Sequence, residues 1–152
     1  MKKAISLIIV ALASGFLLRA QSLEPQPELE FVMELKVKCA DAFQKDGKNI
    51  IPIVGGVFEG PSIKGTVLPD GADTQTITQG RVELMAVYDI RTDDGVVIHV
   101  RNRGIIAGSY FRASPVFEAP ADSRYSWLND AIFVCIPEGR PDYISLKVYR
   151  LK

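Results

Sequence analysis

Two alternating runs of apolar and polar residues, separated by one turn signal, constrain the fold of this chain more than any other feature. The first run, V-E-L-M-A-V-Y-D-I, covers residues 82–90, and the second, rich in β-branched residues, covers residues 96–103. Between them lies Asp94-Gly95, a dipeptide that tolerates the positive φ angles of a tight turn. The sequence therefore predicts a β-hairpin at the centre of the chain.

The same pattern extends over the rest of the chain after residue 28. Residues 29–39 alternate, with Val32 as the one apolar residue on the polar face, which predicts a strand with one buried and one solvated face. Further strands are expected, between Gly, Pro and Asp turn signals, at residues 50–58, 63–68, 73–79, 110–117, 131–136 and 143–151. No amphipathic helix of ten or more residues follows residue 20. We therefore predict an all-β fold: a single closed, mostly antiparallel β-barrel of about eight to ten short strands.

Proline and glycine mark the places where this barrel should be irregular. Pro52 and the pair Gly55-Gly56 interrupt the second predicted strand, which indicates an edge, a bulge or a sharp bend. Residues 41–49 are predicted to form a polar loop, and the Pro- and Gly-rich residues 137–141 a turn.

Length and charge restrict the class of protein. With 152 residues the chain suits one domain with a sizeable core. It carries 18 Lys and Arg against 18 Asp and Glu, a formal net charge of zero. Nucleic-acid binders normally carry a positive excess on one face, so we predict no nucleic-acid partner.

The first residues have a different composition from the rest. A Lys-Lys start, an apolar stretch and a small residue at Ala20 are typical of a secretory signal peptide over residues 1–20. Residues 21–28 follow as an extended, Pro-containing leader, and the domain covers residues 29–152. A retained anchor is the alternative, but the apolar stretch is shorter than the ~20 residues of a spanning helix. We expect a secreted or periplasmic protein with no stable membrane span after cleavage.

Cys39 and Cys135 are the two cysteines of the chain. In an exported protein an even number of cysteines permits a disulfide, and neighbouring strands of a closed barrel can bring the two positions together. The alternative is two separate thiols, because free cysteine is often buried. The register of the strands decides between them, and the sequence does not reveal it.

Five segments in order resemble the DUF3237 (UPF0311) family. They are G-G-V-F-E-G-P at 55–61, G-T-V-L-P-D-G-A-D at 65–73, T-D-D-G-V-V-I-H-V-R-N-R-G at 92–104, Y-F-R at 110–112 and Y-S-W-L-N at 125–129. The resemblance implies a closed β-barrel. It also implies a largely uncharacterised family, of which occasional members cyclise small, oxygen-rich molecules.

The chain departs from this family at three positions. Met85 and Val87 stand where the resemblance implies an acidic and a basic residue, and Thr74 stands where it implies an aromatic one. If that charged pair serves chemistry in relatives, this chain lacks it. An apolar patch containing Met85 and Val87 would instead suit a dimer interface.

The sequence contains no established catalytic motif. It has no phosphate-binding loop, no Cys/His spacing for zinc and no nucleophile elbow. His99 is the only histidine, so a metal site built on a histidine pair is excluded within one chain. We predict no metal and no cofactor. The face of Ile98 is expected to be buried, with His99 on the solvated face.

Weak candidates for general acid and base are Glu59 and Asp73, provided that they converge. The more frequent role of Asp beside Gly is that of a turn residue. Candidates for ligand contacts are cationic, amide or aromatic side chains that would lie in or at the mouth of the barrel. They are Arg101, Asn102, Arg112, Tyr125, Trp127 and Asn129, although Trp127 also suits a core aromatic and Asn129 a turn cap.

Three functions remain open at this stage. The barrel pattern and the aromatic pair Tyr125 and Trp127 favour a protein that binds a small apolar or aromatic molecule in the barrel. The first alternative is an acid–base isomerase or cyclase acting through Glu59 or Asp73. The second is a structural, dimerising module.

Overall fold

A computed structural model describes residues 26–152 of the chain. The predicted signal peptide and most of the predicted leader lie outside these residues. Residues 26–28 have no regular secondary structure, and the first strand begins at Leu29. Within the described part of the chain, no helix has the length and apolar character needed to cross a membrane.

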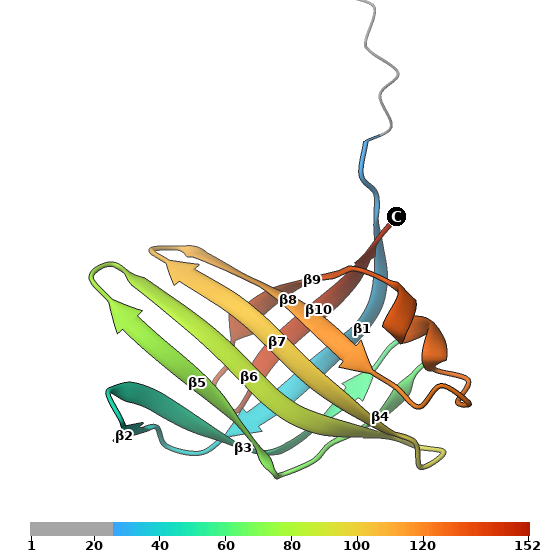
Figure 1. Ribbon diagram of the computed structural model, residues 1–152, viewed down its shortest axis with the longest axis horizontal. Helices are drawn as coiled ribbons and strands as arrows, with labels where there is room; N and C mark the ends of the chain where they lie inside the picture. Colours follow the sequence, from blue (N-terminus) through green and yellow to red (C-terminus); the bar gives the residue numbers. More distant parts are fainter. Residues whose placement is uncertain (1–25) are drawn as a thin grey trace, which may run out of the picture.

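The molecule is a closed antiparallel β-barrel, as predicted (Figure 1). Around the barrel the order is β1, β10, β9, β8, β7 and β6. Next to β6 come β4 and β5, which lie end to end between β6 and β3, and β3 pairs with β1 and closes the ring. The elements are β1 (Leu29–Cys39), β2 (Phe43–Lys45), β3 (Lys48–Glu59), β4 (Lys64–Val67), β5 (Gly71–Thr78), β6 (Arg81–Thr92), β7 (Val97–Ala107), β8 (Tyr110–Glu118), η1 (Ser126–Asp130), β9 (Phe133–Gly139) and β10 (Ile144–Leu151).

The predicted central hairpin is β6–β7. Its register pairs Val82 with Ile106 and runs to Arg91 opposite Val97. The turn itself is a residue longer than the shortest hairpin turn: the N–H of Gly95 donates to the carbonyl of Thr92, and Gly95 has a φ of 89°. This is a type I turn closed by a glycine in the left-handed region, a common three-residue hairpin loop.

Two local predictions were wrong. The polar loop expected at residues 41–49 contains β2, which forms a short hairpin with the start of β3. The turn expected at residues 137–141 begins later, because β9 continues to Gly139 and pairs with β10 as far as Ile144. Proline lacks only the N–H, so Pro137 can remain in a strand on the side where no N–H is needed.

The bend in β3 was predicted correctly. Gly55 and Gly56 have φ angles of 134° and 139°, which L side chains rarely adopt. The register between β1 and β3 shifts at this point, where Cys39 lies opposite Ile53 and Lys38 opposite Gly55. A β-bulge therefore turns β3 from one part of the barrel wall to the next.

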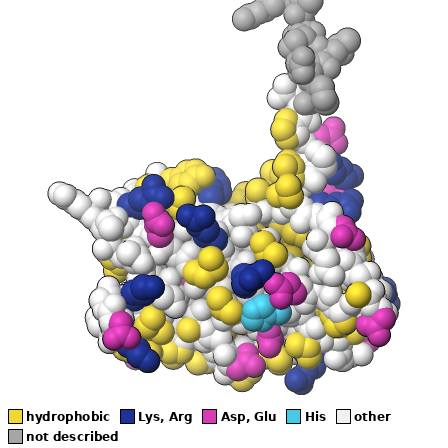
Figure 2. Space-filling view, in the orientation of Figure 1, with side chains coloured by type: hydrophobic (Ala, Val, Ile, Leu, Met, Phe, Trp, Pro, Cys, Tyr) yellow, Lys and Arg dark blue, Asp and Glu magenta, His cyan; other side chains and the backbone are white. Residues whose placement is uncertain are grey.

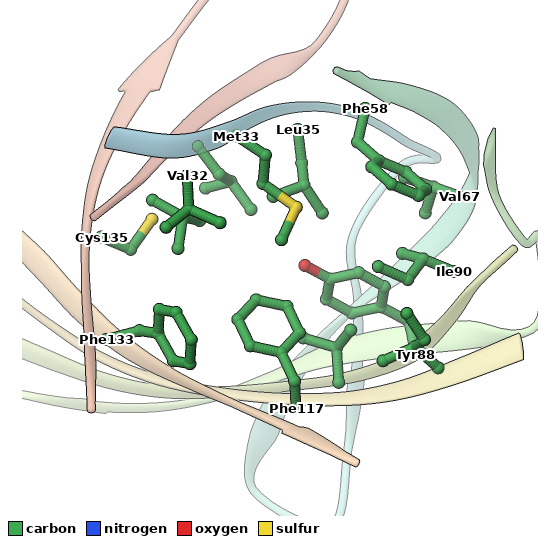
Figure 3. Close-up of a cluster of buried hydrophobic side chains, with 14 of the residues drawn as sticks. Val32, Met33, Leu35, Phe58, Val67, Tyr88, Ile90, Phe117, Phe133 and Cys135 are labelled. Atoms are coloured by element: carbon green, nitrogen blue, oxygen red, sulfur yellow. The ribbon is translucent and has the colours of Figure 1, made fainter. Parts of the chain in front are cut away.

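Buried hydrophobic side chains form one cluster inside the barrel (Figure 3). Phe117 and Phe133 pack edge to face with ring centroids 5.1 Å apart, and Tyr88 directs its hydroxyl toward the centre of the cluster. At the adjoining end of the barrel η1 covers the core with Leu128, which is 1% exposed. The hairpins β2–β3, β5–β6 and β7–β8 lie at the opposite end (Figure 1).

On the face shown in Figure 2, charged and apolar side chains are interspersed. Met85 and Val87 face outward, 39% and 38% exposed. Each lies directly opposite an arginine of β7: Met85 pairs with Arg103, and Val87 with Arg101. The two apolar side chains are therefore flanked by cations on the side of β7, and the dimer interface expected at these positions stays a prediction.

Candidate functional site

A cavity of about 260 Å³ occupies the half of the barrel farther from η1. Inward-facing residues of eight strands surround it, and most of them are apolar. They are Val37, Cys39, Ile51, Ile53, Asp73, Gln75, Leu84, Ala86, Tyr88, Asn102, Ile106, Phe111, Ala113, Pro137, Ile144 and Leu146. An apolar cavity with a few polar side chains is the usual form of a small-molecule site.

Small residues on neighbouring strands leave this space open. Ala86 on β6 and Ala113 on β8 line the cavity and carry only a methyl group each. Gly104 on β7 pairs with Ala113, and a Cβ atom there would lie 2.9 Å from a methyl carbon of Leu84 and 3.2 Å from Cβ of Ala113, so a side chain at this position would have to displace Leu84. Elsewhere in the barrel Phe, Tyr, Leu and Ile fill the corresponding positions.

Asp73 contributes the acid group of the cavity. It is the third residue of β5, and Oδ2 accepts a hydrogen bond of 2.9 Å from Nε2 of Gln75. Gln75 in turn accepts from Asn49 at 3.0 Å, so a chain of amides holds one carboxylate oxygen in place. The other oxygen, Oδ1, is buried and accepts no hydrogen bond from any of residues 26–152.

Burial raises the pKa of the Asp73 carboxyl group above its ordinary value, and the hydrogen bond from Gln75 opposes this in part. The apolar surroundings disfavour the charged carboxylate. A carboxyl group shifted in this direction retains its proton at a higher pH than an exposed one. It can therefore give a proton to a bound molecule and take one back.

Asn102 lies in the same cross-strand row as Asp73. Asp73 pairs with Ala86, and Ala86 pairs with Asn102, so the two polar residues flank the small alanine. At ~4.8 Å between strands, their backbones are about 10 Å apart. Asn102 is 3% exposed, and its Oδ1 accepts no hydrogen bond within the described part of the chain. The row presents an acid and an amide across the wall of one cavity.

Two further ionisable side chains are buried in the barrel: Tyr88, which lines the cavity, and Cys135, which lies in the core. Burial strongly raises the pKa of the Tyr88 hydroxyl, and burial raises the pKa of the Cys135 thiol to about 12, against a smaller opposing effect of Asn102. Both groups are therefore neutral at physiological pH. Asp73 is the one carboxylic acid among the side chains that line the cavity.

Glu59 and Asp73 were proposed as general acid and base on condition that they lie close together, and they do not. Glu59 ends β3 and pairs with Glu34 and Lys64, whereas Asp73 pairs with Ile51 near the start of β3. Asp73 is not a turn residue either, because it lies inside a strand. Of the two predicted acids, only Asp73 faces the cavity.

The inward face of β7 was predicted correctly. Ile98 and Asn102 are buried, whereas His99 and Arg101 face outward. His99 Nδ1 lies 2.6 Å from Asp89 Oδ1, and Arg101 forms an ion pair with Glu118. Neither side chain reaches the cavity, because adjacent residues of a strand point to opposite faces.

Arg112 also lies on the outer face. It donates to the carbonyl of Phe111 at 2.7 Å, and its guanidinium carbon is 5.4 Å from the ring centroid of Tyr110. As an outward-facing residue of β8 it is separated from the cavity by the barrel wall. Among the predicted ligand contacts, only Asn102 therefore lines the cavity.

Tyr125, Trp127 and Asn129 lie at the other end of the barrel. The Tyr125 hydroxyl donates to Asp94 at 2.9 Å and ties its loop to the central hairpin. Asn129 accepts from the N–H of Ala119 at 2.8 Å and donates to its carbonyl at 2.9 Å, in line with the turn-capping alternative. Trp127 packs beside Phe133, with ring centroids 6.3 Å apart.

The disulfide between Cys39 and Cys135 is not formed: both cysteines are free. On β10, Val148 pairs with Cys135 on one side and with Met33 on the other. Cys39 lies six residues beyond Met33 on β1, a rise of about 20 Å along the strand. A disulfide needs Cα atoms within roughly 7 Å, so the register excludes it.

Sequence reasoning missed Gln75, Tyr88 and the small residues that open the cavity. Tyr88 belongs to the alternating run at 82–90, so its inward direction was readable, but it appeared to be an ordinary core residue. For Gln75 no signal exists, because β5 has polar residues on both faces. No group of three or more His, Cys, Asp and Glu side chains suited to a metal ion occurs among residues 26–152.

Comparison with known proteins places the chain in a family. The sequence model of DUF3237, described as a protein of unknown function, matches residues 27–109. The chain belongs to the DUF3237 family. A DUF3237 relative from Clostridium acetobutylicum, a UPF0311 protein, is 34% identical over 123 residues, which cover 68% of this chain and 77% of the relative.

Solved structures agree with the barrel. A protein of unknown function from Rhodopseudomonas palustris has a TM-score of 0.79 and 33% identity, covering 84% of this DUF3237 chain and 99% of its own. A fungal relative is described as a hydroalkoxylation enzyme of Penicillium herquei. It is 28% identical over 127 residues, which cover 80% of this chain and 82% of the relative.

Proposed function

We propose that this protein is an enzyme that transfers protons at Asp73 to and from a small, mostly apolar molecule held in the barrel cavity. The reaction class is isomerisation or ring closure. Asp73 gives a proton to one position of the bound molecule, and its carboxylate takes a proton back from another. The atoms balance without an oxidant, a reductant or a second substrate.

The observation that supports this proposal most strongly is the position of Asp73. Its carboxyl group lies in an apolar cavity, has a raised pKa and has one oxygen without a hydrogen bond from residues 26–152. Enzymes raise the pKa of a carboxyl group by burial when they use it as a general acid near neutral pH. A cavity of about 260 Å³ with apolar walls suits a compact hydrophobic molecule.

The Penicillium herquei relative adds support from chemistry. Hydroalkoxylation adds the O–H of an alcohol across a carbon–carbon double bond, which is a proton-transfer reaction of the proposed class. Asn102, two strands away from Asp73 in the same row, would accept a hydrogen bond from a hydroxyl group of the substrate and orient it.

Asp73→Asn and Glu59→Gln provide a matched test. Protein purified from its own host is first analysed by native mass spectrometry for a co-purifying molecule. That molecule is then incubated with wild-type and variant proteins, and chromatography follows conversion to a product of the same mass. We expect Asp73→Asn to lower the rate by roughly 10²–10⁴-fold, the usual contribution of general acid–base catalysis. The Glu59→Gln variant should convert the molecule at the wild-type rate, because Glu59 lies away from the cavity.

The second candidate function is binding without conversion, favoured by the largely apolar lining of the cavity. Under this alternative the wild-type protein leaves the molecule unchanged and Asp73→Asn retains it. Conversion by Asp73→Asn at the wild-type rate would show that Asp73 is not the proton donor.

A further inference from the structure

The barrel wall contains one weakly joined seam, between β8 and β9. Every other neighbouring pair of long strands is joined over several residues, but β8 and β9 pair only at Ala113 and Cys135. A side-chain bond supplements this pair: Oγ of Ser114 donates to the carbonyl of Phe133 at 2.9 Å.

Two prolines explain the seam. With Ala113 opposite Cys135, an antiparallel register places Pro115 opposite Phe133 and Pro137 opposite Phe111. Backbone groups two residues apart in a strand point to the same neighbour, so both prolines face the seam. Neither has an N–H to donate. The ladder is therefore interrupted on both sides of its single paired position.

An external groove of about 610 Å³ follows this seam. Its lining includes outward-facing Ile105, Tyr110 and Ile136 and also inward-facing Ala113 and Cys135. Ala113 lines the interior cavity as well. The groove and the cavity thus adjoin through the seam, on either side of a residue with only a methyl side chain.

Two arginines flank the groove without acidic partners. Arg103 lies opposite Ser114, and Arg112 lies opposite Ile105, so the two are diagonal neighbours roughly 7–8 Å apart. Neither forms an ion pair with an acidic side chain among residues 26–152. Two cationic side chains on one face of the wall repel each other, and a carboxylate or sulfonate bound by both would relieve that repulsion and accept their hydrogen bonds.

We infer that the β8–β9 seam is a side entrance to the cavity, used by apolar molecules that carry an anionic group. Arg103 and Arg112 receive the anion at the groove. The apolar part then passes between the strands at Ala113 as the seam opens. The inference rests on the proposed function, because it takes the interior cavity to be the destination of the molecule.

A disulfide across the seam tests the entrance. Ala113 and Cys135 are directly opposite in a hydrogen-bonded antiparallel pair, where Cα atoms are ~5.5 Å apart, a distance that permits a disulfide. Ala113→Cys can therefore lock the seam through the native Cys135, and a reductant can unlock it. Two fluorescent probes with one aromatic framework are compared by stopped flow: 1-anilinonaphthalene-8-sulfonate, an anion, and N-phenyl-1-naphthylamine, which is neutral.

We expect oxidised Ala113→Cys to take up both probes at least about tenfold more slowly than the reduced variant, since local opening of the seam is blocked. If the oxidised form takes up each probe as fast as the reduced form does, the inference is overturned and molecules enter through the end of the barrel. Ser114→Ala, which loses the bond to Phe133, leaves the cavity lining intact. It should take up both probes faster, and an unchanged rate would also count against the seam.

The arginines are tested by the double variant Arg103→Gln/Arg112→Gln at low salt. Uptake of the anionic probe should slow by roughly tenfold or more, as expected for lost electrostatic steering, while uptake of the neutral probe stays unchanged. If the double variant takes up the anionic probe as fast as the wild-type protein does, the anion site is overturned. The uptake of both probes is measured without any conversion of a substrate, so failure of the proposed chemistry and failure of the side entrance give different results.

Discussion

Ala86 is the position at which the cavity can be filled from within. It lies between Asp73 and Asn102 in one cross-strand row, and its methyl group borders the open volume of about 260 Å³. Ala86→Leu adds an isopropyl group to that space. The larger side chain would occupy the volume in front of Asp73 without removing any hydrogen bond.

The expected effect on stability follows from burial. At ~0.8 kcal/mol per buried carbon group, the three added carbons contribute at most ~2.4 kcal/mol. Fixing the leucine rotamer costs roughly 0.5–1 kcal/mol. We therefore expect the free energy of unfolding to rise by at most ~1.5 kcal/mol while conversion of the bound molecule is lost.

Ala119→Leu is the matched control. Ala119 is 8% exposed, as is Ala86, but it belongs to the packed core and does not line the cavity. Leucine there should overpack the core and lower the free energy of unfolding by about 1–3 kcal/mol. Urea denaturation followed by tryptophan fluorescence measures both variants, with equal m-values as the condition for comparing midpoints. A destabilised Ala86→Leu protein that still converts its substrate would refute the assignment of this cavity as the site.

Two further predictions concern other parts of the barrel. Tyr125→Phe should lower the melting temperature at pH 7, because the hydrogen bonds from Thr92 and Tyr125 lower the pKa of Asp94 and stabilise the folded state when Asp94 is charged. That stabilisation is present above the ordinary Asp pKa of about 3.9 and is lost as pH falls through the lower folded-state pKa, so a difference in melting temperature that grows toward pH 2 would contradict it. A thiol reagent should modify Cys39, which is an exposed residue, in the native protein. This reaction should be slow, because partial desolvation of the thiol raises its pKa. Cys135 is buried and should react only after unfolding. Two thiols modified at one rate in the native protein would contradict the burial of Cys135.

Much of the fold was readable from local patterns. The alternation of residues 82–90 and 96–103 predicted a hairpin and also its buried face, because one face carries Ile98 and Val100 and the other carries charge. The inward direction of Asn102 follows from the same alternation. The barrel itself follows from many short strands with turn signals between them.

The candidate site was only partly predictable. Asp73 lies on a strand whose two faces are both polar, so alternation did not reveal which face is inside. Its raised pKa arises from residues of other strands that surround it. Glu59 and Asp73 appeared to be equivalent candidates in the sequence. In the structure Asp73 pairs with Ile51 near the start of β3, whereas Glu59 is the last residue of β3, so most of the length of that strand lies between the two acids.

The sequence by itself determined the class of fold, the position of most strands and the face that each apolar run buries, since these depend on residues close together in the chain. The tertiary structure alone decided that Cys39 and Cys135 stay apart, that Asp73 faces a cavity and that two prolines meet at one seam. These features depend on the register between strands that are distant in sequence. A shift of register changes every such neighbour while leaving the local pattern of each strand unaltered.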